Sequence, residues 1–191
     1  MDAAEPWARF PGRERWLEIG FGGGEHACAV AEAHPEAALV ACEVFENAIC
    51  SMLSRLVPDE GREADGPLPD NLGLYTQDAR PLLRAVPDAT LDRLFLMFPD
   101  PWPKSRHAKR RFVHPVMVAE VARALRPGGV WRIASDDPTY QAWTATVLAG
   151  QDVFDVPPPA NTRAHDWPPT RYEAKAIRAG RAPLYWTLTR R

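Results

Sequence analysis

A short apolar run that breaks into glycines constrains the fold of this chain more than any other feature. It reads Leu17-Glu18-Ile19-Gly20-Phe21-Gly22-Gly23-Gly24 and is followed by an alanine-rich stretch, Ala27 to Ala33. A buried strand that ends in a glycine turn and opens a helix has this pattern, which is typical of the first unit of an open α/β sheet. The glycine spacing is a weak signal of ligand binding by itself, because such turns also occur without a ligand.

The glycine turn carries a carboxylate at its mouth, because Glu18 stands two residues before Gly20. Turns that bind dinucleotides offer bare amides and a helix N-terminus to a pyrophosphate, which a nearby anion would repel. S-adenosylmethionine has no phosphate, and its ammonium and sulfonium groups favour carboxylates. The turn therefore favours this methyl donor. A nicotinamide dehydrogenase remains an alternative, since Gly22-x-Gly24-x-x-Ala27 also fits the dinucleotide pattern.

Length and composition limit the class of protein. The 191 residues, 46% of them apolar, suit a single globular domain over residues 1–191. No apolar run approaches the ~20 residues that span a bilayer, and the start lacks the pattern of a secretory signal, so we expect a cytoplasmic protein without membrane contacts. The three cysteines and five histidines show no metal-ligand spacing. We therefore expect buried structural thiols and no metal site.

Apolar runs of strand length alternate with helix-like stretches along the chain, which predicts a parallel α/β sheet. We expect strands at 16–19, 38–42, 72–76, 91–98, 130–135, 152–156 and 184–189, and helices at 25–34, 44–57, 79–84, 112–125, 139–148 and 174–179. The almost continuously apolar run 91–98 should lie in the middle of the sheet, covered on both faces. Residues 1–13 are interpreted as an aperiodic lead-in, and 58–71 as an exposed loop that should tolerate partial deletion.

An acid stands at the end of each of the first five predicted strands: Glu18, Glu43, Asp78, Asp100 and Asp136. Open α/β sheets bind ligands at the carboxyl edge of their strands, so five carboxylates there imply a cationic ligand. Glu43, 21 residues after Gly22, is placed to grip both hydroxyls of a ribose. Asp78 either faces an adenine or caps the next helix, and the two roles can hold together.

A basic run follows the fourth strand and a proline-rich turn, Pro99-Asp100-Pro101-Trp102-Pro103. The chain has a formal charge of −2, yet this run holds five permanent cations within eight residues: Lys104, Arg106, Lys109, Arg110 and Arg111. A charge run is usually a solvated face, but one beside a predicted pocket favours contact with a phosphate backbone. Basic patches also bind heparin, membranes and acidic proteins, so the run alone leaves its partner open.

Together these motifs resemble the bacterial tRNA (guanine-N(7)-)-methyltransferases, from about Leu17 to the C-terminus. The resemblance is carried by Glu18-Ile19-Gly20-Phe21-Gly22, Phe98-Pro99-Asp100-Pro101-Trp102, Lys104, Arg106-His107-x-Lys109-Arg110-Arg111, Ser135-Asp136 and Thr170-x-Tyr172-Glu173. The proline-rich turn with its basic run is far more specific than the glycine turn. The resemblance implies a Rossmann-like class I methyltransferase fold, with a seven-stranded, mostly parallel sheet, helices on both faces and an antiparallel last strand.

The resemblance also implies ligands and contacts. S-adenosylmethionine would be held by Glu18, Glu43, Asp78 and Asp100, with Gly20 and Gly22 of the turn. The tRNA would be contacted by Lys104, Arg106, Lys109, Arg110, Arg111, Asp136, Thr170, Arg171, Tyr172 and Glu173. The implied reaction is methylation of the variable-loop guanine at N7, and we expect a monomer or weak homodimer.

Guanine N7 has an in-plane lone pair and no proton at neutral pH, so it can attack a sulfonium methyl without a general base. Positioning then dominates catalysis. Asp100 is the expected carboxylate that stabilises charge developing on the base, with Asp136 as the second choice. Because N7 lies on the narrow major-groove edge of A-form RNA, the target should be an exposed base in a folded loop.

Two further alternatives remain for the function. One is a methyltransferase that acts on another RNA or on a small molecule, which the glycine turn permits but which leaves the basic run without a role. The other is a non-catalytic RNA-binding module. That module would leave the strand-end acids unexplained, because carboxylates repel phosphates.

Overall fold

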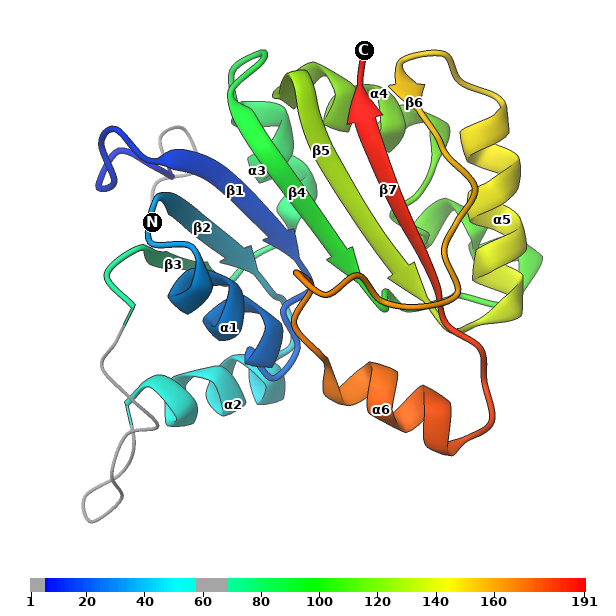
Figure 1. Ribbon diagram of the computed structural model, residues 1–191, viewed down its shortest axis with the longest axis horizontal. Helices are drawn as coiled ribbons and strands as arrows, with labels where there is room; N and C mark the ends of the chain where they lie inside the picture. Colours follow the sequence, from blue (N-terminus) through cyan, green and yellow to red (C-terminus); the bar gives the residue numbers. More distant parts are fainter. Residues whose placement is uncertain (1–5, 58–68) are drawn as a thin grey trace.

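The computed structural model describes residues 6–57 and 69–191, which are organised around a seven-stranded sheet (Figure 1). The strand order is β3-β2-β1-β4-β5-β7-β6. The strands are β1 (Glu14–Ile19), β2 (Ala37–Cys42), β3 (Leu72–Tyr75), β4 (Leu91–Met97), β5 (Leu125–Ser135), β6 (Phe154–Asp155) and β7 (Leu184–Arg190). The first five strands are parallel, and β7 is antiparallel to both β5 and β6. The expected mostly parallel sheet with an antiparallel last strand is confirmed.

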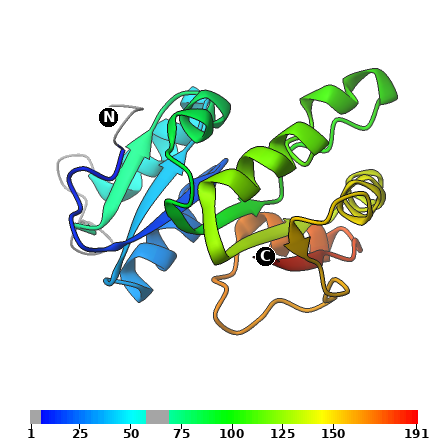
Figure 2. The ribbon, with the colours of Figure 1, turned by 90° about the horizontal axis from the view of Figure 1, so that it is seen from above.

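Helices lie on both sides of this sheet, as Figure 2 shows. They are α1 (Glu25–Ala33), α2 (Glu46–Leu56), α3 (Ala79–Ala85), the 3-10 helix η1 (Ser105–Arg110), α4 (Pro115–Ala124), α5 (Pro138–Ala149) and α6 (Arg171–Arg178). In Figure 1, α6 lies beyond the arrowheads of β1 and β4, at the same edge of the sheet at which α1 begins. This arrangement brings a late segment of the chain next to the glycine turn.

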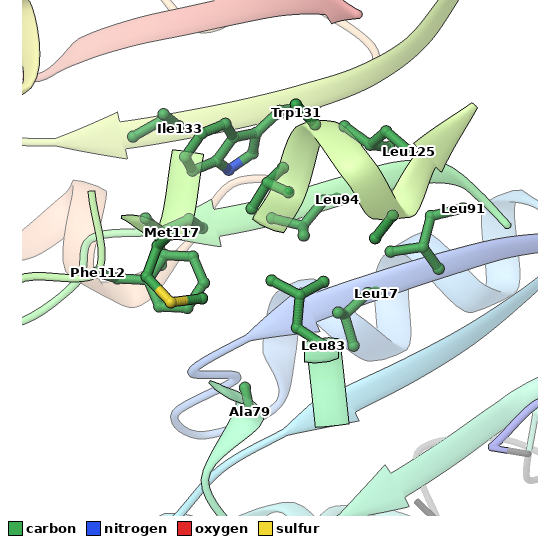
Figure 3. Close-up of a cluster of buried hydrophobic side chains, with 14 of the residues drawn as sticks. Leu17, Ala79, Leu83, Leu91, Leu94, Phe112, Met117, Leu125, Trp131 and Ile133 are labelled. Carbon is green, nitrogen blue, oxygen red and sulfur yellow. The ribbon is translucent and has the colours of Figure 1, made fainter. Parts of the chain in front are cut away.

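Side chains of each central strand alternate between two hydrophobic clusters. Leu17 packs into the cluster covered by α3, α4 and α5, part of which Figure 3 shows, whereas its neighbour Trp16 packs into the cluster under α1 and α2. β4 lies between β1 and β5 and contributes to both clusters, with Leu94 on one face and Phe95 on the other. Burial on both faces explains why its sequence is apolar almost throughout.

The segment before β1 belongs to the core, which the interpretation of residues 1–13 as a lead-in did not anticipate. Trp7 and Phe10 are buried in the cluster that also contains Leu17. The indole Nε1 of Trp7 donates to the carbonyl oxygen of Ala38 at 3.0 Å. This contact fixes the segment against β2.

Several element boundaries differ from expectation. α6 begins at Arg171 instead of 174, β6 has only two residues, and α4 begins at Pro115, whose missing N–H costs nothing at the first helical position. β5 begins at Leu125 instead of 130. The extra residues are accommodated where the register against β4 shifts, between the pairs Leu91 with Leu125 and Arg93 with Val130.

The expected loop 58–71 lies mostly outside the described residues, but its last residue is a structural one. Asn71 is 3% exposed. Its amide nitrogen lies 2.9, 3.0 and 2.8 Å from the carbonyl oxygens of Ala31, His34 and Ala37. These bonds satisfy carbonyls at the end of α1 and the start of β2, so a deletion in this loop should spare Asn71.

Burial of the cysteines was predicted correctly for two of the three. Cys28 and Cys42 are buried, whereas Cys50 is exposed on α2. α2 packs into the core with only one of its sides, because Met52 is fully buried while Leu53 is 45% exposed. Within 6–57 and 69–191, no group of acids, histidines and cysteines is arranged to hold a metal ion, and none of the helices is long and apolar enough to cross a membrane.

Candidate active site

A cavity of about 290 Å³ opens where β1, β2, β3 and β4 end. The carboxyl edge of a parallel sheet is where open α/β folds bind ligands. The cavity is lined by the ends of β1, β2 and β4, by the segments that follow the four strands, including the start of α3 and the end of η1, and by Tyr172 of α6. Its lining includes Gly20, Gly22, Glu43, Val44, Phe45, Asp78, Arg80, Phe98, Asp100, Trp102, Arg110 and Tyr172. The structure thus brings both predicted glycines and three of the five strand-end acids to one site.

Glu43 joins the glycine turn to the end of β2. Its Oε2 accepts a hydrogen bond from the backbone N–H of Gly22 at 3.0 Å, and its Oε1 accepts from Val44 and Phe45 at 2.7 and 3.1 Å. The residue is 7% exposed. A carboxylate has about four acceptor positions, so three backbone donors leave capacity for one ligand donor.

Asp78 has the capping role that the sequence left open, and the second role, facing an adenine, stays a prediction. Its carboxylate accepts from the backbone N–H of Arg80 at 2.9 Å and so caps α3, and it also lines the cavity. Asp100 lines the cavity from the loop after β4 and is exposed. It has no ion-pair partner among residues 6–57 and 69–191, so its charge is available to a ligand.

Glu18 is not among the residues that line the cavity, and its expected cofactor contact stays a prediction. Successive side chains of a strand point to opposite faces, so Glu18 shares the face of Trp16 and points toward α1. Its Oε2 lies 3.0 Å from Nδ1 of His26, and both side chains are buried. Glu18 therefore anchors the helix that follows the glycine turn.

Asp136 is also occupied elsewhere. Its Oδ2 lies 2.7 Å from Nε of Arg181, and the residue does not line the cavity. Of the two carboxylates considered for the developing charge, only Asp100 lies at the cavity.

Arg111 is a structural residue and not an exposed phosphate contact. Its guanidinium donates to the carbonyl oxygens of Pro101 and Trp102 at 3.1 and 3.0 Å, and it lies 4.8 Å from the ring centroid of Trp143. The residue is 5% exposed. These contacts hold the proline-rich turn in place, and burial leaves Arg111 little surface for the phosphate contact that was expected of it.

The other four cations of the basic run, Lys104, Arg106, Lys109 and Arg110, are exposed on or beside η1. In the part of the chain that the structure describes, none of them pairs with a carboxylate. Arg110 also lines the cavity. These charges are therefore available to an anionic partner at the edge of the cavity.

The segment at the start of α6 divides into structural and accessible residues. The Oγ1 of Thr170 caps the helix by accepting from the N–H of Glu173 at 3.0 Å. Glu173 is 8% exposed and accepts from Arg163 and from the hydroxyl of Tyr185, the latter at 2.7 Å. Burial raises the pKa of Tyr185, and the bond to Glu173 raises it further. Neither Thr170 nor Glu173 lines the cavity, and their expected substrate contact stays a prediction.

Tyr172 and Arg171 are the accessible members of this segment. Tyr172 lines the cavity and is 40% exposed. It packs on the glycine turn so closely that a Cβ added to Gly22 would lie 3.0 Å from its ring. Gly22 also has a φ of 55°, so both the nearby ring and the backbone conformation require a glycine at this position. Arg171 is exposed, and its Nε lies 3.9 Å from Glu25.

Sequence reasoning missed Arg80, whose guanidinium lines the cavity between Asp78 and η1. The only signal was a cation two residues after a strand-end acid, which is too common to indicate a site. Two apolar residues of the cavity wall were missed as well, because Val44 and Phe45 follow β2 without any distinctive spacing.

Comparison with known proteins identifies the family of the chain. A family model described as a putative methyltransferase matches residues 13–185. A tRNA (guanine-N(7)-)-methyltransferase from Granulibacter bethesdensis is 65% identical over 176 residues, which are 92% of this chain and 78% of that protein. The chain belongs to the tRNA (guanine-N(7)-)-methyltransferase family.

Other relatives agree with this membership and with the fold. The family member from Paramagnetospirillum magneticum is 45% identical to this chain, over all of this chain and 79% of its own length. Among solved structures, a 16S rRNA (adenine(1408)-N(1))-methyltransferase from Catenulisporales acidiphilia, which contains its cosubstrate SAM, superposes with a TM-score of 0.62. It is 13% identical and matches 100% of this chain and 92% of its own, so it supports the class I methyltransferase fold alone.

Proposed function

We propose that this chain transfers the methyl group of S-adenosylmethionine to N7 of the variable-loop guanine of tRNA. The observation that carries the proposal is a juxtaposition at one sheet edge. Carboxylates line the cavity, while the unpaired cations of η1 lie beside it, with Arg110 in its wall. Membership of the tRNA (guanine-N(7)-)-methyltransferase family supports the same substrate and reaction.

The donor set of the cavity suits S-adenosylmethionine. Glu43, Asp78 and Asp100 present negative charge, which favours a ligand with ammonium and sulfonium groups and disfavours the pyrophosphate of a dinucleotide. Glu43, with one acceptor position left, would accept from one hydroxyl of the ribose, and Asp78 would face the adenine. Phe45 is 61% exposed beside them and offers an apolar surface to the adenine ring. When bound, S-adenosylmethionine supplies the methyl group.

The residues of the chain then have to position the base, not to remove a proton. Guanine N7 carries a lone pair and no proton, so no general base is required, and correct placement of N7 supplies most of the acceleration. The base becomes positively charged as N7 is methylated. The carboxylate of Asp100 would stabilise that charge, because it is fixed in the rigid turn after β4 before the reaction begins.

The alternatives each leave part of the site without a role. A non-catalytic RNA-binding module would not need three carboxylates in a cavity beside its cations, and a methyltransferase for small molecules would not need the cations. A nicotinamide dehydrogenase would place a pyrophosphate among the carboxylates. Only methyl transfer to a polyanion uses both the carboxylates of the cavity and the cations beside it.

We further propose that the chain acts in the cytoplasm as a single methyltransferase domain and as a monomer or weak homodimer. Every strand of the described part belongs to one sheet, which supports the single domain. Light scattering after gel filtration, across a concentration series with and without tRNA, tests the oligomeric state.

Methyl transfer to a modified transcript tests the proposed function. A tRNA transcript incubated with the protein and methyl-labelled S-adenosylmethionine should acquire label. The matched control is the same tRNA with 7-deazaguanosine at the variable-loop position, which keeps the base and all phosphates but replaces N7 with carbon. It should bind equally well and acquire no label. Equal labelling of the two RNAs would contradict the proposal.

A further inference from the structure

Trp102 stands apart from the other tryptophans of the chain. All seven lie in the described residues, and the other six pack into the two hydrophobic clusters. Trp102 belongs to neither cluster. It is half-buried instead and lines the cavity beside Asp100. A large aromatic ring outside the core and in a ligand cavity suggests that its partner is the ligand.

The backbone holds this ring in an unusual place. Trp102 has a φ of 42°, which is uncommon for a residue with a bulky side chain and persists only where the surroundings enforce it. Two prolines flank it, and Arg111 donates to its carbonyl oxygen and to that of Pro101. The buried guanidinium and the two prolines thus set where the indole lies.

The surroundings of the ring leave room for a planar ligand. The guanidinium of Arg110 lies over the indole, 4.7 Å from the ring centroid, and His107 meets the indole nearly edge-on, with centroids 5.8 Å apart. These are the ring's contacts with aromatic and cationic groups in residues 6–57 and 69–191, and the half-buried residue also lines the cavity. Unpaired bases of RNA are recognised by stacking on such aromatic rings and on arginine planes.

We propose that Trp102 is the platform on which the target purine base stacks, with the guanidinium of Arg110, which lies over the ring and also lines the cavity, as a second planar group beside it. This inference rests on the proposed function and adds a substrate subsite to it. Stacking on a ring that the backbone has already oriented would place the base beside Asp100 without any base-specific hydrogen bond. The surrounding cations hold the phosphates, and the indole selects an unstacked base.

Two substitutions of similar bulk separate stacking from simple filling of space. Trp102→Phe keeps an aromatic face, whereas Trp102→Leu keeps only apolar volume. Because stacking of one base changes affinity by about 10- to 100-fold, single-turnover methylation of a tRNA transcript should fall by about that factor in the leucine variant and by about threefold or less in the phenylalanine variant. Affinity for S-adenosylmethionine should not change in either.

A control and a second readout keep the test independent of folding. Trp186 on β7 is buried in the core and does not line the cavity, so Trp186→Phe should lower the melting temperature and leave the single-turnover rate unchanged. If the leucine variant does not fold, Trp102→Met replaces it.

The second readout is 2-aminopurine at the target position of the tRNA, bound in the presence of S-adenosylhomocysteine. Its fluorescence should be quenched more strongly by the wild type and by Trp102→Phe than by Trp102→Leu. Equal quenching, or a leucine variant that methylates as fast as the wild type, would overturn the inference. A wild type that does not methylate tRNA at all would instead overturn the proposed function.

Discussion

Arg80 and Arg110 are joined where the cavity meets the basic segment: Nη2 of Arg80 donates to the carbonyl oxygen of Arg110 at 2.9 Å. Nη1 of the same guanidinium lies 3.4 Å from each carboxylate oxygen of Asp78, and all three residues line the cavity. The start of α3, where the adenine is expected, is therefore tied to the end of η1, where the phosphates are expected.

Arg80→Ala should weaken binding of both S-adenosylmethionine and tRNA. Because its bonds are half-exposed, we expect a loss of about 0.5–1.5 kcal/mol for each ligand, the range of an ordinary hydrogen bond. Calorimetry with the cofactor and fluorescence anisotropy with labelled tRNA measure the two affinities. Arg84→Ala is the matched control, since it removes an exposed cation from the same helix. An Arg80 variant that loses affinity for neither ligand would show that this tie has no role.

Substitutions of the cations in the basic run should differ in how they change the salt dependence of tRNA binding. Lys109→Ala and Arg110→Ala should each flatten the slope of log affinity for tRNA against log salt by about 0.8, because each exposed cation releases counterions from one phosphate. Arg111→Ala should leave that slope nearly unchanged and lower the free energy of unfolding by about 1.5–3 kcal/mol, since it loses hydrogen bonds from a charged donor. Filter binding across a salt series and urea denaturation measure the two effects. If Arg111→Ala flattened the salt slope of tRNA binding without lowering the free energy of unfolding, Arg111 would be a phosphate contact after all.

Glu18 and Glu43 should have separable roles although both end buried strands. Glu43→Gln should weaken S-adenosylmethionine binding about 10- to 100-fold, the range expected for hydrogen bonds to a charged group. Glu18→Gln and His26→Ala should instead lower the free energy of unfolding by about 1.5–3 kcal/mol each, because they break a buried bond to a charge. A double-mutant cycle should show strong coupling between Glu18 and His26. A Glu18→Gln variant that keeps its stability and loses the cofactor would restore the expected direct contact.

The three cysteines should differ in how readily they are alkylated near pH 8. Burial raises the pKa of Cys28 to about 11 and also raises the pKa of Cys42, so both stay protonated near pH 8, and only the thiolate reacts. Exposed Cys50 should therefore be alkylated by iodoacetamide while the other two are protected until the protein unfolds. Peptide mass spectrometry locates the label. Early labelling of Cys28 in folded protein would contradict its burial against α2.

The sequence predicted the parts of the fold that depend on local pattern. The continuous apolar run of β4 placed that strand in the middle of the sheet, and the cap was one of the two roles expected for Asp78, because capping needs only its immediate neighbours. The limits of β5 were missed because residues 126–129 are accommodated at a register shift against β4, which the local glycine and proline signals do not encode.

The sequence predicted which types of residue gather at the sheet edge, but only in part which of their side chains point into the cavity. Glu18 and Glu43 look alike in sequence, but the alternation of β1 turns one toward α1, while the loop after β2 turns the other into the cavity. Within the basic run, no pattern distinguishes Arg111 from Arg110. What separates them is the pair of carbonyl oxygens that the folded turn presents to Arg111.

Nucleoside mass spectrometry of a treated tRNA transcript tests methylation at guanine N7 most directly. The wild type with S-adenosylmethionine should yield 7-methylguanosine, and mapping should locate it in the variable loop. Asp100→Asn, which removes the charge and keeps the shape, should form the same product roughly 10²–10³ times more slowly under single-turnover conditions. A methyl group on any other atom of the RNA, or no methylated nucleoside at all, would contradict the proposed reaction.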